Sequence, residues 1–282
     1  MPSYCSPRGC LLFEQALAPF LAEEGLPFAS VLPAETIAQA FAEEGVGFGT
    51  TKNSVFTPAL TLWAFLSQVV HEAKSCHAAV LRVATLLIAL ARTPCSEDTA
   101  AYCRARAKVP ACVLRRLARD VSRNLEDQVP AAWLWQGKHV QLVDGTTVTL
   151  PDTEENQQAY PQPDSQKPGL GFPMIRLVVL LSLATAALLD MAFGPYQGKE
   201  TGETALLRQV LGAVPAGDLL LADRYYCTYW LVALAGAQGL DVVFRLHQHR
   251  AYDFRRGRRL GKDDHLATWP KPQRPDWMEE AT

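Results

Sequence analysis

The sequence has little net charge and no long apolar segment. Its 282 residues carry 27 basic and 29 acidic side chains, which leaves a formal net charge of -2. A chain this close to neutral has no general attraction for nucleic acids or membranes, so any such attraction must come from local patches. The longest apolar stretch, residues 177–189, has 13 residues, whereas a membrane-spanning helix needs about 20. We therefore expect no membrane partner.

Motifs for thiolate metal sites, disulfides and nucleotide binding are also missing. The seven cysteines are odd in number and form no Cys-x-x-Cys pair, so neither a zinc site nor a disulfide framework is expected. Buried reduced thiols are typical of a cytosolic protein, and the chain does not open like a signal peptide. No Gly-x4-Gly-Lys-Ser/Thr segment predicts a phosphate-binding loop. The apolar fraction of 49% and the charged fraction of 20% indicate a folded globular chain.

Charge is concentrated in three segments. Residues 1–50 form an acidic segment, with six acidic side chains and one basic side chain. Residues 92–123 contain eight basic and three acidic side chains, and residues 245–262 contain seven basic and one acidic. Two basic segments in a near-neutral chain indicate a surface for a polyanion, although an ordinary solvated face has the same composition.

The pattern over residues 51–135 predicts a helical domain. Thr57 followed by Pro58 is typical of a helix start, because the hydroxyl caps the first turn and proline fits its first position. Ser75 and Ser96 are expected to cap two further helices, and a fourth follows with basic flanks, which makes this domain a candidate for DNA binding. In the first helix, apolar side chains recur at helical spacing: Leu62, Trp63, Leu66, Val69 and Val70.

From about residue 138 the pattern changes to alternating strands and helices. A strand is expected to end at Asp144, followed by a threonine-rich return at 146–150 and a loop at 151–172. Further strands are expected at 175–182, 187–193, 218–222 and 241–246, with helices at 202–212 and 226–238. This order predicts an α/β fold over residues 136–250, with a mixed sheet flanked by helices.

Two aspartates follow short apolar strands in this half of the chain. Asp144 and Asp223 are each expected at the carboxyl end of a strand, where open α/β sheets place their sites. A single aspartate at such a position is most often a turn former. Together, however, two carboxylates from separate strands suit Mg²⁺, which prefers oxygen ligands. Paired ions of this kind promote phosphodiester chemistry, which normally needs a third carboxylate as well.

Several segments resemble one known family. Residues 143–147 (VDGTT) and 221–226 (LADRYY) resemble the first- and second-aspartate motifs of DDE-type insertion-sequence transposases, in particular the IS4-like family. Residues 198–204 (GKETGET) look like the Gly-Glu-Thr segment of that family, and residues 95–106 look like its helical region before the catalytic domain. The resemblance covers about residues 55–250.

The resemblance implies a fold, a cofactor and a partner. It implies a ribonuclease-H-like core in which Asp144 and Asp223 are catalytic and bind Mg²⁺ or Mn²⁺. Its substrate would be DNA at the inverted-repeat ends of a transposon. A helical domain at residues 51–135 would bind this DNA. It leaves a homo-oligomer open and implies a bacterial cytoplasmic, nucleoid-associated protein. The arginines expected to contact DNA are Arg104, Arg106, Arg115, Arg116, Arg224, Arg255 and Arg256.

The family's third carboxylate is not matched. It is a glutamate within a Tyr-x2-Arg-x3-Glu-x6-Lys signature on a helix that follows an inserted β-region. Tyr252 and Arg255 have the first spacing, but position 259 is arginine. Residues 251–282 look like the start of the inserted region. We therefore expect a truncated transposase with little or no activity by itself.

Two other functions stay open on the sequence. One is a DNA-binding remnant without catalysis, which could inhibit a full-length transposase. The other is an unrelated α/β enzyme that uses Asp144 and Asp223 on a small phosphate ester, which would predict no basic surface around the two aspartates.

Overall fold

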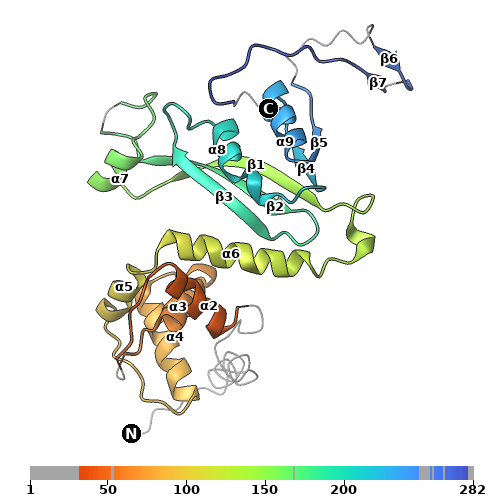
Figure 1. The fold of residues 1–282 in the computed structure, drawn as a ribbon. Helices are drawn as coiled ribbons and strands as arrows, with labels where there is room; N and C mark the ends of the chain where they lie inside the picture. The colour runs from red at the N-terminus through yellow and green to blue at the C-terminus, as the bar shows by residue number, and fades with distance from the viewer. Residues whose placement is uncertain are drawn as a thin grey trace. The chain divides into compact units, whose positions relative to one another are not determined.

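The fold is taken from a computed structural model, which describes residues 32–51, 54–167, 169–247, 255, 257–262 and 264–278 (Figure 1). The chain divides into two compact units, Met1–Val121 and Ser122–Thr282. Most of the acidic segment 1–50 and part of the basic segment 245–262 lie outside the described residues. Among those described, no helix is both long and apolar enough to span a bilayer. The five cysteines in this part of the chain are free thiols, but only Cys227 is buried and Cys112 is exposed.

The first unit is helical. Its helices are α2 (Ala34–Glu43), α3 (Pro58–Val70), α4 (Cys76–Ala89), α5 (Ala100–Arg106) and the beginning of α6 (Ala111–Glu126). The Thr57 hydroxyl accepts a hydrogen bond from the Leu60 N–H, and Ser75 caps α4 in the same way at Ala78. Both predicted caps are therefore confirmed.

Two details of the helical prediction are wrong. Ser96 does not cap α5, which begins only at Ala100. The Ser96 hydroxyl accepts from the Asp98 N–H, and the Asp98 carboxylate in turn accepts from the Ala100 N–H. Val69 and Val70 are exposed rather than packed, because they occupy the last turn of α3. The remaining stripe packs into a core built around Leu62, Trp63, Val80, Val83 and Tyr102.

The second unit contains the predicted mixed sheet (Figure 1). Its strands lie in the order β3-β2-β1-β4-β5. Strand β2 is antiparallel to both β1 and β3, whereas β1, β4 and β5 are parallel. This arrangement confirms the predicted α/β fold with a mixed sheet. The strands are β1 (Val140–Thr149), β2 (Met174–Ser182), β3 (Leu188–Pro195), β4 (Leu219–Ala222) and β5 (Asp241–Phe244).

Helices α8 (Glu203–Val210) and α9 (Tyr229–Ala237) share one apolar core with the sheet. Val143, Val178 and Leu180 contribute to this core from β1 and β2, whereas Leu206 and Leu231 contribute from the two helices. Alternate residues of β1 are buried, because successive side chains of a strand point to opposite faces. Shorter elements complete the unit: η1 (Ala131–Trp133), α7 (Glu154–Ala159), η2 (Leu211–Ala213), β6 (Arg258–Arg259) and β7 (His265–Leu266).

Strand β1 is longer than the sequence pattern predicts. It does not end at Asp144 with a return at 146–150 but continues to Thr149, because its second half pairs with β2 from Asp144↔Val179 to Thr149↔Met174. Threonine and valine favour strands, and whether they extend one depends on a partner strand. The predicted loop 151–172 also contains α7, which is capped by Thr153.

A polar network closes the end of the sheet where β1 and β4 begin. The Glu126 carboxylate lies 2.9 Å from His139 Nδ1 and accepts hydrogen bonds from Gln141 Nε2 at 3.3 Å and Thr185 Oγ1 at 2.9 Å. Gln141 Nε2 also donates to Asp218 Oδ2 at 2.9 Å. Gln141 and Asp218 are buried. Glu126 and Asp218 are therefore engaged in hydrogen bonds within the fold.

Candidate functional site at the ends of β1 and β4

Asp144 and Asp223 occupy equivalent positions on neighbouring parallel strands. The last paired residues of β1 and β4 are Val143 and Ala222, and each aspartate follows one of them directly. Neighbouring strands lie about 4.8 Å apart, so the two aspartates are neighbours across the sheet. The structure thus brings together the two residues that the sequence singled out. Asp144 differs from the expectation in one respect, because it lies within β1, at the point where that strand loses β4 as a neighbour.

Each of the two carboxylates has a single local hydrogen bond. Asp144 Oδ1 accepts from the Gly145 N–H at 2.8 Å, and Asp223 Oδ1 accepts from the Tyr225 N–H at 2.8 Å. Both aspartates are exposed. Neither forms an ion pair within the part of the chain that the structure describes. These bonds orient one oxygen of each side chain.

Two further residues of the site were not assigned a role from the sequence. Glu203, the first residue of α8, places its carboxylate against Gly145, where a Cβ would lie 2.4 Å from Glu203 Cδ. Tyr226 is 1% exposed, and its hydroxyl makes no hydrogen bond of ordinary geometry to the described residues. Burial, followed by the carboxylates of Glu203, Asp144 and Asp223, raises the pKa of Tyr226. Both residues lie within the motifs at 198–204 and 221–226, but only the packed fold brings them together.

The acidic pair fits a divalent cation. Mg²⁺ is usually held by one or two carboxylates, keeps several waters and completes its shell with phosphate oxygens. Asp144 and Asp223 supply two such carboxylates without competing cations. Within the described ranges, no group of three or more histidine, cysteine, aspartate or glutamate side chains is arranged to hold a metal ion. The arrangement therefore suits an open site for a hydrated ion rather than a closed protein cage.

The arginines expected to contact DNA have different surroundings. Arg106 donates to Gln68 Oε1 at 3.1 Å and lies over the Tyr102 ring, with its Cζ 5.7 Å from the ring centroid. Arg116 forms ion pairs with Glu43 and Asp120. Arg104 is exposed on α5. Of the others, Arg115 lies on α6, Arg224 follows Asp223, Arg255 is exposed, and Arg256 lies outside the described residues.

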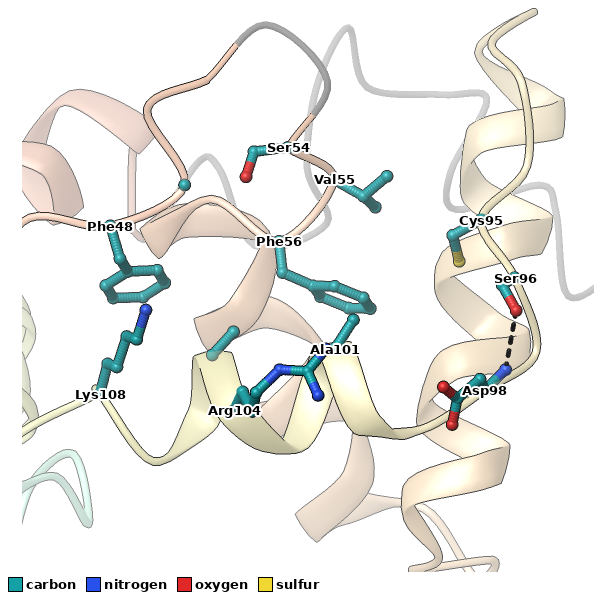
Figure 2. A pocket seen from close by; sticks show the side chains of 12 residues that line it. Phe48, Ser54, Val55, Phe56, Cys95, Ser96, Asp98, Ala101, Arg104 and Lys108 are labelled. Carbon is teal, nitrogen blue, oxygen red and sulfur yellow. Dashed lines mark hydrogen bonds between the residues drawn. The ribbon is translucent and has the colours of Figure 1, made fainter.

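Arg104 also lines a pocket of about 400 Å³ in the helical unit (Figure 2). Phe48 and Phe56 form its apolar wall, and Lys108 places its ammonium 5.9 Å from the centre of the Phe48 ring. Figure 2 shows the Arg104 side chain beside the Phe56 ring. This pocket contains neither Asp144 nor Asp223, so it is separate from the acidic pair.

Comparison with known proteins identifies the family. A sequence model of the family described as the transposase DDE domain matches residues 135–277, which is just over half of the chain and includes Asp144, Glu203 and Asp223. The chain belongs to the DDE transposase family. The resemblance to DDE-type transposases noted in the sequence is thereby confirmed.

Two curated relatives support this DDE transposase assignment. The transposase InsG of insertion sequence element IS4, from Escherichia coli K12, is 26% identical over 236 residues, covering 83% of this chain and 51% of InsG. InsZ of the same strain, named as a putative transposase, is 27% identical over 132 residues, covering 46% of this chain and 41% of InsZ. The chain therefore spans about half the length of the curated relatives that it matches.

One solved structure shows a weaker likeness to this chain. The piggyBac transposase, in a synaptic complex with hairpin DNA, matches with a TM-score of 0.36 and 11% identity, covering 86% of this chain and 51% of that one. A likeness of this size does not by itself establish a shared fold.

Proposed function

We propose that this chain acts on the DNA ends of an insertion sequence, with Asp144 and Asp223 holding the divalent metal that promotes phosphoryl transfer. The observation that carries the proposal is the register of β1 and β4. It sets the two aspartates immediately after the Val143↔Ala222 pair, on neighbouring parallel strands. Membership of the DDE transposase family supports the same chemistry.

Within this proposal, Asp144 and Asp223 bring two negative charges to one place. When bound, Mg²⁺ or Mn²⁺ would polarise the scissile phosphate and lower the pKa of an attacking water. The nucleophile would be water in the first step and a DNA 3′ hydroxyl in the second. The hydrogen bonds from the Gly145 and Tyr225 N–H groups hold one oxygen of each carboxylate in place. This preorganisation matters because phosphoryl transfer depends strongly on positioning.

We further propose that the 51–135 domain binds the inverted-repeat DNA. Arg104 and Arg115 lie on its helices, whereas Arg224 and Arg255 lie beyond it, in the acidic-pair unit. Arginine contacts with phosphates supply affinity that is independent of sequence and falls with salt. A DNA-bound protein of this kind would act at the bacterial nucleoid in the cytoplasm, where a second copy could occupy the other transposon end.

The family's glutamate signature is not matched in these 282 residues, since position 259 is arginine. We therefore propose that the chain alone binds metal and DNA but cleaves DNA slowly or not at all. Incubation with the inverted repeats that flank its own coding sequence, in Mg²⁺ or Mn²⁺, tests this part. Efficient cleavage that disappears in Asp144→Ala would contradict the low activity and support the acidic pair.

The metal site itself is tested by titrating the chain with Mn²⁺ and following free Mn²⁺ by electron paramagnetic resonance. We expect saturable binding that Asp144→Asn and Asp223→Asn each greatly weaken. Asp241→Asn is the matched control, because Asp241 is an exposed aspartate at the opposite end of the sheet. Unchanged Mn²⁺ binding in both Asp144→Asn and Asp223→Asn would rule the proposed function out.

A further inference from the structure

Glu203 is a third carboxylate beside the acidic pair, and the packing of the chain holds it there. Its Cγ and Oε2 would each lie 2.7 Å from a Cβ at position 145. Real side chains do not approach one another so closely, so the carboxylate can occupy this place only because residue 145 is glycine. Gly145 follows Asp144 directly, which sets Glu203 next to the first residue of the pair.

Tyr226 is a second feature of this acidic region. Its side chain is almost fully buried, yet its hydroxyl has no hydrogen-bond partner of ordinary geometry among the described residues. A buried hydroxyl without a partner is energetically unfavourable. Its electrostatic surroundings are the carboxylates of Glu203, Asp144 and Asp223. This phenol is therefore directed into the acidic region of the site.

The charge of this region is not compensated by the described part of the chain. Neither Asp144 nor Asp223 nor Glu203 has an ion-pair partner there. The neighbouring acid Glu200, in contrast, pairs with Arg208. Like charges held close together repel one another, and a divalent cation is the usual means of relieving that repulsion in proteins.

We propose that Glu203 is a positioning residue for the divalent cation at Asp144 and Asp223, acting through water on the ion. Water-mediated action follows from the geometry, because the described residues include no group of three acids placed to ligate one ion directly. Mg²⁺ retains several waters, whose protons need acceptors. The Tyr226 hydroxyl is a donor that can steady the Glu203 carboxylate. This inference rests on the proposed function and adds a residue to it.

The experiment compares Mn²⁺ dissociation constants of the whole chain and its variants by paramagnetic resonance. We expect Glu203→Gln to weaken Mn²⁺ binding about 10-fold, since loss of an outer-shell partner typically costs 10–100-fold in metal affinity. Glu203→Asp should recover part of this loss, because it restores the charge. Tyr226→Phe should weaken binding less than Glu203→Gln does. The control is Glu200→Gln, which removes an equal charge three residues away and should leave the dissociation constant unchanged.

Each outcome decides between the two proposals. An unchanged Mn²⁺ affinity in Glu203→Gln, alongside a loss in Asp144→Asn, would overturn the role of Glu203 and leave the acidic pair intact. Equal losses in Glu203→Gln and Glu200→Gln would also overturn it, because general charge would then explain the effect. No Mn²⁺ binding by the unaltered chain would overturn both proposals. Thermal unfolding of every variant, followed without metal, shows whether a lost affinity reflects lost folding, and a loss that follows the melting temperature alone would count against Glu203.

Discussion

Strands β1 and β4 have acidic residues near both of their ends, and the surroundings of these residues are opposite. Where the strands begin, Glu126 accepts hydrogen bonds from Gln141 and Thr185, and Asp218 is buried beside the same glutamine. Where their pairing ends, Asp144 and Asp223 are exposed, with one local hydrogen bond each. Glu126 and Asp218 are engaged in hydrogen bonds within the fold, whereas Asp144 and Asp223 remain available to a ligand.

Burial and hydrogen bonding shift the pKa values of Glu126 and Asp218 at the first end. Burial opposes the ionised form of Glu126, but hydrogen bonds from Ser182, Thr185, Gln141 and His139 outweigh it and lower the pKa of this carboxyl. Burial raises the pKa of Asp218, and the hydrogen bond from Gln141 only partly offsets that rise. We therefore expect the hydrogen-bond network around Glu126 to stabilise the folded chain. Changes at the two ends of the sheet should have separable consequences.

The largest expected effect concerns metal binding. The double variant Asp144→Asn/Asp223→Asn should lose Mn²⁺ affinity by more than about 100-fold, because even outer-shell changes cost 10–100-fold. Its unfolding without metal should be unchanged or occur at higher temperature, since like charges are removed. Thermal unfolding with and without Mn²⁺ measures both properties, because a ligand that binds only the folded state raises the melting temperature. Strong destabilisation of the metal-free double variant would contradict the comparison, because it would show that Asp144 and Asp223 also stabilise the fold.

The opposite result is expected at the other end of the sheet. Glu126→Gln replaces an acceptor by a group that cannot satisfy all of its donors, and should cost about 1–3 kcal/mol of unfolding free energy. Its Mn²⁺ affinity should be that of the unaltered chain. Urea unfolding gives the first quantity, and resonance titration gives the second. A variant of full stability would show that the network does not hold this end together.

A smaller effect is expected for two arginines of the helical unit, of which one is exposed and the other is engaged within the fold. Arg104 is exposed, whereas Arg106 is bound to Gln68 and lies over Tyr102. Arg104→Ala should weaken binding to inverted-repeat DNA several-fold and reduce its salt dependence by about one phosphate contact. Arg106→Ala should instead mainly lower the melting temperature. Mobility shifts at several salt concentrations, paired with thermal unfolding, distinguish the two. Equal DNA affinities for Arg104→Ala and the unaltered chain would show that Arg104 does not contact DNA.

The smallest effect is on the pH dependence of stability. The pKa of Glu126 is lower in the folded chain than its ordinary value of 4.5. Its stabilisation is therefore complete above pH 4.5 and is lost as the pH falls below that value through the folded pKa. Urea unfolding at a series of acidic pH values should show a shallower fall for Glu126→Gln than for the unaltered chain. Parallel curves would show that Glu126 does not contribute to acid sensitivity.

Local sequence signals predicted much of the fold. Thr57 and Ser75 cap helices where their side-chain chemistry indicated, because a cap is decided within a few residues. The strands that precede Asp223 and contain Asp144 were visible as apolar runs. Their adjacency followed from the rule that sites form at the carboxyl ends of neighbouring strands.

The remainder depends on long-range contacts. Strand β1 extends to Thr149 only because β2 lies beside it, some thirty residues later in the chain. The placement of Glu203 against Gly145 requires α8 to pack on the sheet. Thr185 and Glu126 are 59 residues apart in sequence. No periodicity within a short window contains this information.

The most direct test of the account is a crystal of the chain soaked in Mn²⁺ and measured by anomalous diffraction. The account predicts one or two anomalous peaks between β1 and β4, with oxygens of both Asp144 and Asp223 at about 2.1 Å, a distance typical of hard divalent ions. Peaks that touch only one of these aspartates, or that lie elsewhere while both carboxylates remain unoccupied, would contradict it.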